Sequence, residues 1–293
     1  MMKTAFFWAA FFVCIGGIGA AQTKMPSVTL NSGYDMPVFG LGTWTLDDAA
    51  AEAAVYEAIK NGYRLIDTAV IYRNETGVGK AVNRAIKEGL VTRQEVFITT
   101  KLNQRVLDPD KEIDSCLKRL NIDYIDLVLL HHHGANDDKI YRALERGVKS
   151  KKIRSIGISN FYTDTAVNHF IQDFEIKPAV IQNENHLFHQ STRLQQYCKK
   201  YGIYIESYYP LGGRGHTKES LTNTVITRIA KAHNKTAAQI ILRWHIQAGF
   251  IAIPGSKNPV HIKENIGIFD FELSQTEMND IATLNINKRY ENW

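Results

Sequence analysis

Eight short apolar runs recur along the chain from residue 39 onward, each followed by a segment of helical period. Such runs are typical of buried strands, and their alternation with helices is typical of a parallel sheet. The runs are Phe39–Leu41, Arg64–Asp67, Val96–Thr99, Ile125–Leu130, Ile153–Gly157, Ala179–Gln182, Ile203–Glu206 and Phe250–Ile253. No Pro/Ser-rich linker divides the series, so we predict one α/β domain, a closed (β/α)8 TIM barrel. An open doubly wound sheet is the alternative, but the Gly-Leu-Gly-Thr-Trp after the first run is not GxGxxG.

A hairpin is predicted ahead of the barrel. Val28–Leu30 and Met36–Val38 are short β-type segments separated by an Asn-Ser-Gly turn. Among the helical segments, residues 47–60 and 110–120 begin with acidic residues. We expect Asp47 to cap the first of these helices and Asp110, after a proline, to cap the second.

The first 21 residues differ from the rest of the chain. A lysine at position 3 precedes an apolar run over residues 5–18 and three small residues at 19–21. This pattern predicts a secretory leader, with the barrel as a single domain over residues 22–293. The protein would then be exported or periplasmic, without stable membrane association after leader removal, and cytoplasmic otherwise. An uncleaved anchor and a true start near Met25 are the alternatives.

Composition restricts the classes of partner. Apolar residues make up 44% of the chain and charged residues 22%, with a formal charge of +5. Lys and Arg are scattered, whereas nucleic-acid binding would require a basic stripe, so we predict no nucleic-acid partner. We also expect a monomer. Cys14, Cys116 and Cys198 have no CxxC spacing, and Cys14 lies in the leader. At most one disulfide could therefore form, and we expect two free buried thiols instead.

Polar residues follow nearly every predicted strand, at the rim where barrel enzymes place their reactive groups. They are Asp67, Lys101, His131, Ser159, Asn160, Gln182, Tyr208 and Ser256, with Tyr72 in the loop after Asp67. The sequence therefore predicts an active site at this end of the barrel.

Several local motifs carry a resemblance. Asp67-Thr68-Ala69 with Tyr72 and Asn74-Glu75, Thr100-Lys101-Leu102, Leu130-His131 and Gly157-Ile158-Ser159-Asn160-Phe161 occur in this order. In these motifs the chain resembles the aldo-keto reductase family, essentially throughout from residue 28. The resemblance implies nicotinamide-dependent reduction of a carbonyl, with Asp67, Tyr72, Lys101 and His131 as catalytic residues.

Each of the four residue types suits its implied role. Carbonyl reduction needs a hydride at carbon and a proton at oxygen. A tyrosine holds its proton at neutral pH, and a cationic Lys101 would lower the pKa of Tyr72 and make it a better acid. Asp67 would hold the lysine, and His131 can donate a hydrogen bond to the carbonyl oxygen.

The resemblance also assigns a cofactor site. Ser159, Asn160 and Gln182 suit a nicotinamide carboxamide, and Tyr208 suits stacking on its ring. The complete set of predicted cofactor residues is Thr43, Ser159, Asn160, Gln182, Tyr208, Leu211, Gly213, Ser256, Lys257, His261 and Asn265. Relatives often carry a lysine and an arginine for the 2′-phosphate where this chain has Gly255 and His261, although Lys257 could replace the charge. We therefore predict NADPH, with NADH possible.

Trp44 resembles the family's pocket tryptophan and, with His131, would contact the substrate. Short loops after the histidine and a short chain end predict an open site for small aldehydes, α-dicarbonyls or keto-sugars. His131-His132-His133 departs from the family, where a proline is common in this segment. A metal-dependent hydrolase using these histidines with His186 and His189 is one alternative, although we predict no metal. A non-catalytic cofactor-binding regulatory module is the other.

Overall fold

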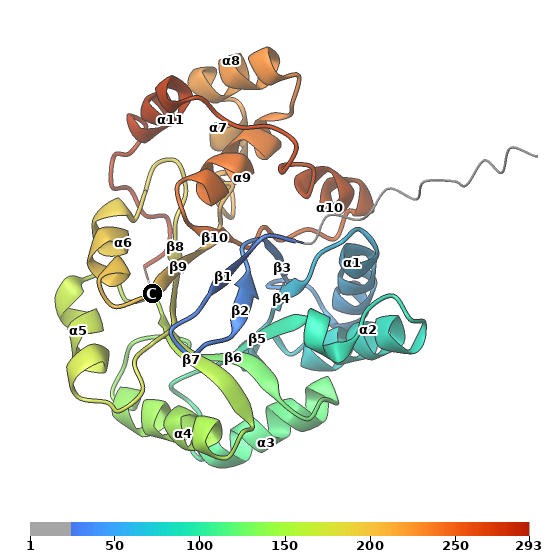
Figure 1. Ribbon diagram of the computed structural model, residues 1–293, viewed down its shortest axis with the longest axis vertical. Coiled ribbons are helices and arrows are strands. Elements are labelled where there is room, and N and C mark those ends of the chain that lie inside the picture. The colour runs from blue at the N-terminus through green and yellow to red at the C-terminus, as the bar shows by residue number, and fades with distance from the viewer. Residues whose placement is uncertain (1–24, 293) are drawn as a thin grey trace, which may run out of the picture.

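The computed structural model describes residues 25–292, which form a closed barrel of eight parallel strands (Figure 1). The strands follow one another in chain order around the ring. They are β3 Gly40–Gly42, β4 Leu65–Asp67, β5 Phe97–Leu102, β6 Ile125–Leu130, β7 Ile153–Ser159, β8 Val180–Glu184, β9 Tyr204–Tyr208 and β10 Ile251–Ala252. Bridges from Phe39 to Ala252 and from Gly42 to Gly255 join the first and last of them. The predicted (β/α)8 TIM barrel is therefore confirmed.

Helices surround the barrel on the outside (Figure 1). Their bounds are α1 Asp48–Lys60, α2 Glu75–Lys87, α3 Pro109–Leu120, α4 Asp137–Lys149, α5 Asp164–Gln172, α6 Thr192–Lys199, α7 Thr217–Leu221, α8 Thr224–His233, α9 Ala237–Gln247, α10 Pro259–Asn265 and α11 Gln275–Ala282. Their inward faces and the outward faces of the strands form the main apolar core, which includes the buried free thiols of Cys116 and Cys198. The expectation of two free buried thiols is confirmed for these cysteines.

The N-terminal hairpin closes one end of the barrel. β1 (Ser27–Thr29) and β2 (Asp35–Pro37) pair antiparallel, each beginning one residue earlier than predicted. Figure 1 shows the hairpin lying across the barrel opening. Buried Leu30 and Met36 belong to a second apolar cluster that includes Leu65, Phe97 and Val180, the first residues of their strands. The hairpin thus seals the end where the strands begin and leaves the opposite end for the site.

One of the two predicted helix caps is wrong. The side chain of Asp47 accepts a hydrogen bond from the amide of Ala50 at 2.8 Å, so it caps α1 as predicted. At α3 the cap is Asp108, which accepts from the amide of Lys111 at 3.1 Å. Proline favours the first helical position because it lacks an N–H, so the capping residue precedes it. Asp110 instead lies in the first turn and forms an ion pair with Arg146.

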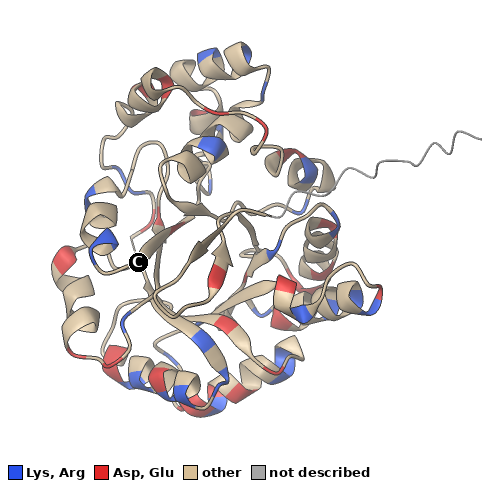
Figure 2. Ribbon diagram, in the orientation of Figure 1, with Lys and Arg blue, Asp and Glu red and all other residues tan. Residues whose placement is uncertain are grey.

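Charged side chains of both signs are interspersed along the outer helices (Figure 2). Within residues 25–292, no helix has the length and apolar character needed to cross a bilayer. The predicted leader, including Cys14, lies outside the described residues.

Candidate active site

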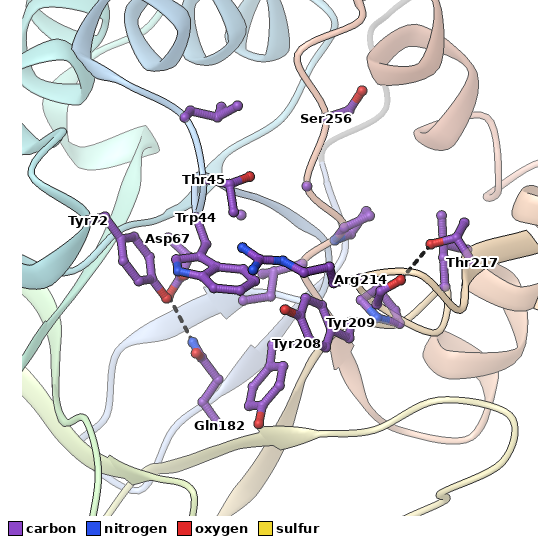
Figure 3. A pocket seen from close by; sticks show the side chains of 18 of the residues that line it. Trp44, Thr45, Asp67, Tyr72, Gln182, Tyr208, Tyr209, Arg214, Thr217 and Ser256 are labelled. Atoms are coloured by element: carbon purple, nitrogen blue, oxygen red, sulfur yellow. Dashed lines mark hydrogen bonds between the residues drawn. The ribbon is translucent and has the colours of Figure 1, made fainter. Parts of the chain in front are cut away.

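A cavity of about 830 Å³ lies at the end of the barrel where the strands finish (Figure 3). Cavities of this size are typical of small-molecule sites. Most of the predicted site residues line it: Trp44, Asp67, Tyr72, His131, Ser159, Asn160, Gln182, Tyr208, Leu211, Gly213, Ser256, Lys257, His261 and Asn265. Thr43 and Lys101 are fully buried and lie behind its wall.

Asp67, Lys101 and Tyr72 form a chain of hydrogen bonds at the base of the cavity. The ammonium of Lys101 on β5 lies 2.6 Å from Asp67 Oδ1 on β4 and 2.9 Å from the carbonyl of Thr68. Its third donor reaches the hydroxyl of Tyr72 at 3.1 Å. Tyr72 ends a 3-10 turn over Val70–Tyr72, which returns its ring toward the strand ends. All three donors of the lysine are therefore used, which holds it against the tyrosine hydroxyl.

This arrangement keeps Tyr72 protonated. Burial alone would lower the pKa of Lys101, but Asp67 and Tyr72 outweigh it and raise that pKa above its ordinary value. Burial raises the pKa of the Tyr72 phenol, and the charge of Lys101 opposes this without reversing it. Lys101 therefore lowers the pKa of Tyr72 as expected, but burial outweighs it and the net shift of that pKa is upward. Tyr72 retains its proton at neutral pH and can act as an acid.

His131 lies beside the tyrosine at the end of β6. The two rings are 5.7 Å apart and meet edge to face. Burial, with the charge of Lys101, holds the pKa of His131 well below its usual range. Its Nδ1 is buried and has no hydrogen-bond partner within residues 25–292. A neutral imidazole can donate one hydrogen bond to a substrate oxygen without adding a second cation beside Lys101.

The neighbouring histidines do not gather around His131 as metal ligands. The ring of His132 stacks on that of His131 at 4.1 Å, and its Nδ1 lies 3.1 Å from the Asn160 amide nitrogen. His133 pairs with Asp137, and His186 pairs with Glu184. The part of the chain that the structure describes holds no group of three or more His, Cys, Asp or Glu placed to bind a metal.

Among the residues predicted to contact a nicotinamide, Asn160 already uses its side-chain amide in hydrogen bonds within the protein. Asn160 lies in the left-handed region at φ 68°, and its amide nitrogen donates to the carbonyl of His131 at 2.9 Å. Its amide oxygen accepts from the hydroxyls of Tyr208 and Tyr162 at 2.8 and 3.2 Å. A ligand must therefore displace one of these bonds to engage Asn160. Ser159 and Tyr208 line the same wall of the cavity.

The loop after β9 forms another wall. Gly212 and Gly213 have positive φ, and a Cβ on Gly213 would lie 2.4 Å from the Tyr209 ring. The guanidinium of Arg214 lies 4.6 Å from the centre of the Trp44 ring, so the loop after β9 contacts the segment that follows β3 (Figure 3). Glycines let the backbone come close to a ligand, and Arg214 adds a positive charge beside it.

The far end of the cavity follows β10. Ser256, Lys257, His261 and Asn265 all line it, at or near the start of α10. Asn258 caps that helix by accepting from the amide of Val260 at 3.0 Å. This end can hold an anionic group through Lys257.

Several lining residues were not predicted as site residues. Arg214 and Tyr209 lie in the loop after β9, and Glu264 lies on α10. Their positions next to Gly213, Tyr208 and Asn265 were the available signal. Glu206, on β9, was also missed, although it hydrogen-bonds to Gln182 within the barrel.

The cavity suits a nicotinamide dinucleotide. The cavity is lined near Tyr72 by the ring of Tyr208 and by the polar side chains of Ser159, Asn160 and Gln182. Gly213 also lines it, at a position where a Cβ would not fit, and Lys257 lines the far end. When bound, such a cofactor supplies hydride to a carbonyl carbon. Tyr72 and His131 lie side by side in the cavity, where a carbonyl oxygen could contact both.

Comparisons with known proteins agree with this geometry. The aldo/keto reductase family model matches residues 38–286. Glyoxal reductase of Bacillus subtilis is 44% identical, over 90% of this chain and 94% of its own length. NADPH-dependent D-xylose reductase of Meyerozyma guilliermondii is 39% identical, over 91% of this chain and 96% of its own.

A solved relative supports the same conclusion. The crystal structure of a Bombyx mori aldo-keto reductase in complex with NADP has a TM-score of 0.85 to this chain and 34% identity. The alignment covers 92% of this chain and 95% of that one. The chain therefore belongs to the aldo/keto reductase family of NAD(P)H-dependent carbonyl oxidoreductases.

Proposed function

We propose that this protein uses NADPH to reduce small aldehydes, α-dicarbonyls or keto-sugars to alcohols, with Tyr72 as proton donor. The observation that carries the proposal is the Tyr72 hydroxyl, which lines the cavity and lies 3.1 Å from the Lys101 ammonium. A substrate carbonyl placed between Tyr72 and His131 would receive a proton from the first and a hydrogen bond from the second.

The cavity and the relatives both support a small substrate. Trp44, Ile71 and the His131–His132 stack line the cavity near Tyr72 and offer apolar and aromatic contacts. The named substrates of two relatives are glyoxal and D-xylose, which are small and oxygen-rich. We therefore expect α-dicarbonyls and short sugars to be reduced with higher kcat/KM than bulky ketones.

Two features support NADPH over NADH. Lys257 lines the far end of the cavity, where a 2′-phosphate would lie, and the Bombyx mori relative was solved with NADP. We expect weaker discrimination than a lysine–arginine pair would give, because a single flexible lysine is a point charge.

The deciding experiment is turnover of NADPH with a panel of carbonyls, comparing the wild type with Tyr72→Phe. We expect the variant to lose about 10²–10⁴-fold in kcat while binding NADP⁺ normally, because only the transferable proton is removed. Tyr34→Phe is the matched control, since Tyr34 lies in the turn of the hairpin at the opposite end of the barrel. Unchanged turnover in Tyr72→Phe refutes the donor assignment. No turnover with any carbonyl favours a cofactor-binding regulatory module, and bound stoichiometric zinc favours a hydrolase.

We further propose that residues 1–21 are a secretory leader and that the mature protein, beginning at Gln22, is an exported or periplasmic monomer. The charged, apolar and small-residue segments of the sequence support the leader. The intact mass of the secreted protein tests the cleavage site, and light scattering tests the monomer.

A further inference from the structure

Glu206 is a carboxyl group in the barrel interior that the proposed reaction does not use. It lies on β9 directly opposite Gln182 of β8, and its side chain is fully buried. Its Oε2 accepts a hydrogen bond from the Gln182 amide nitrogen at 2.7 Å. Its Oε1 is buried and has no partner within residues 25–292. A buried carboxyl with one satisfied oxygen is costly and is therefore a candidate for a functional role.

Gln182 connects this carboxyl to the catalytic group. The same amide nitrogen that reaches Glu206 also donates to Asp67 Oδ2 at 2.8 Å (Figure 3). Asp67 is ion-paired with Lys101 and can only accept, so the NH2 end of the Gln182 amide faces it, and the same nitrogen donates to Glu206 Oε2. The amide oxygen of Gln182 accepts no hydrogen bond within residues 25–292, and the residue lines the cavity. The two carboxyls therefore orient the amide with its oxygen available to a donor such as a carboxamide NH2.

Glu206 is also electrostatically coupled to the tetrad. Asp67, Lys101 and Tyr72 are the titratable groups that face it, while its strand neighbours present Gln182 from β8 and Ile251 from β10, which do not titrate. Burial, together with the charge of Asp67, raises the pKa of Glu206 to about 8. At neutral pH Tyr72 and Glu206 therefore favour their neutral forms, beside the Lys101–Asp67 ion pair.

We propose that Glu206 is a positioning residue of this reductase, which orients the Gln182 amide toward the carboxamide end of the cofactor and, as a neutral acid, lets Tyr72 release its proton. The proposal rests on the proposed NADPH-dependent reduction. As Tyr72 gives its proton to the carbonyl oxygen it becomes a phenolate. A neutral Glu206 adds no repulsion, whereas an ionised Glu206 raises the pKa of Tyr72 and opposes the transfer.

Two substitutions separate the two effects. Glu206→Gln retains an oxygen that can accept from Gln182 and removes the titration. Glu206→Leu removes both the acceptor and the titration. Glu145→Gln is the matched control, because Glu145 is a buried carboxyl on α4, where it accepts from the backbone amide of Ile176 at 2.9 Å.

The first readout is the pH dependence of the single-turnover rate of NADPH oxidation. In the wild type we expect the rate to fall with an apparent pKa of about 8, since ionising Glu206 opposes proton release. Glu206→Gln should hold its rate to the higher pH at which Tyr72 itself titrates, and Glu145→Gln should follow the wild type. A fall near pH 8 that survives in Glu206→Gln overturns the electrostatic part.

The second readout is the dissociation constant of NADP⁺, measured by quenching of protein fluorescence. Glu206→Gln should bind within about twofold of the wild type, and Glu206→Leu about five- to tenfold more weakly, as expected for loss of one oriented hydrogen bond. Equal binding by Glu206→Leu overturns the orienting part.

The third readout needs neither turnover nor cofactor. Glu206 has a folded-state pKa raised above its unfolded value, so the folded state binds more protons between about pH 4.3 and 8 and loses stability as pH rises through this range. The stability of Glu206→Gln relative to the wild type should therefore increase from pH 5 to pH 8 in thermal unfolding. A pH-independent difference overturns the raised proton affinity. If the wild type reduces no carbonyl, the proposed function fails, while NADP⁺ binding and unfolding still decide the role of Glu206.

Discussion

At the scale of single residues, the buried charges of Lys101 and Asp67 at the base of the cavity neutralise each other. Lys101 and Asp67 are both buried, and each is compensated by the other at 2.6 Å. Removing one partner of a buried pair leaves an unpaired charge, whereas removing both does not.

We therefore expect Lys101→Met to lower the free energy of unfolding by about 3–5 kcal/mol and to abolish most of the reductase activity. Adding Asp67→Asn should restore much of the stability, because no charge then remains unpaired, without restoring turnover. Urea denaturation and NADPH oxidation measure the two effects. A double variant as unstable as the single one would contradict the compensation.

A second residue-scale prediction concerns His131. Its pKa is held well below the usual range by burial and by Lys101, so it is neutral at neutral pH. The rate of reduction of a non-ionising aldehyde should then show no acidic limb at the ordinary imidazole pKa of about 6.5. An acidic limb with an apparent pKa near 6.5, lost in His131→Asn, would show that the imidazole is charged in the working enzyme.

At this scale the sequence predicted the site residues that lie at strand ends, because the end of a strand specifies where its side chain lies in the barrel. Asp67, Lys101 and His131 follow strands whose apolar pattern is strong, so their placement at one rim required no knowledge of distant contacts. Glu206 was missed because its role depends on Gln182 and Asp67, which three-dimensional pairing brings to it. Asn160 was found, but its bonds to Tyr208 and His131 could not be read from spacing.

At the scale of elements, the existence of strands and helices could be predicted more readily than their ends. Eight strands appear where eight apolar runs lie, because burial requires an apolar run. Their bounds shift by up to three residues; β6 matches the predicted Ile125–Leu130 at both ends, whereas β10 retains only Ile251–Ala252. The ends depend on hydrogen bonds to neighbouring strands, which the pattern of one segment does not contain.

The cap of α3 provides a test at this scale. Asp108→Ala should lower stability by about 1 kcal/mol, because it leaves an amide of the first turn without its acceptor. Asp110→Ala, which removes only an exposed ion pair with Arg146, should cost about 0.5 kcal/mol or less. Urea denaturation of the two variants measures both losses of stability. A larger loss of stability in Asp110→Ala than in Asp108→Ala would show that Asp110 is the cap.

Close packing of α2 gives another prediction. A Cβ on Gly79 would lie 2.3 Å from the carbonyl oxygen of Leu120, at the end of α3. Gly→Ala ordinarily stabilises an exposed helix by about 0.5–1 kcal/mol, but here α2 and α3 would have to separate. Gly79→Ala should therefore lower the melting temperature, whereas Ala is tolerated at an open helix position such as Lys80. A higher melting temperature would show that the two helices can yield.

At the scale of the whole molecule, stability and chemistry occupy opposite ends of the barrel. The hairpin buries Met36 against the strand beginnings, while the cavity lies at the strand ends. Met36→Ala should lower the free energy of unfolding by about 2–5 kcal/mol and leave KM for NADPH within about twofold. A large change in KM would mean that the two ends are coupled.

The proposed preference for NADPH can be tested at the end of the cavity that Lys257 lines. Lys257→Met should weaken NADPH binding about tenfold, or about 1.4 kcal/mol, and leave NADH binding unchanged. Lys263→Met is the control, because Lys263 is on α10 but does not line the cavity. An equal loss of affinity for NADPH and NADH would show that Lys257 contacts a group that both cofactors share.

The bridges that close the barrel also affect how the chain can be synthesised. Phe39 pairs with Ala252, and Gly42 pairs with Gly255, so one edge of the first strand stays unpaired until the last strand has been synthesised. Contacts of such long sequence separation form slowly, and a ribosome must release nearly the whole chain before they can form at all. If residues 1–21 direct export, this delay would keep the growing chain from closing its barrel before it reaches a translocation pore.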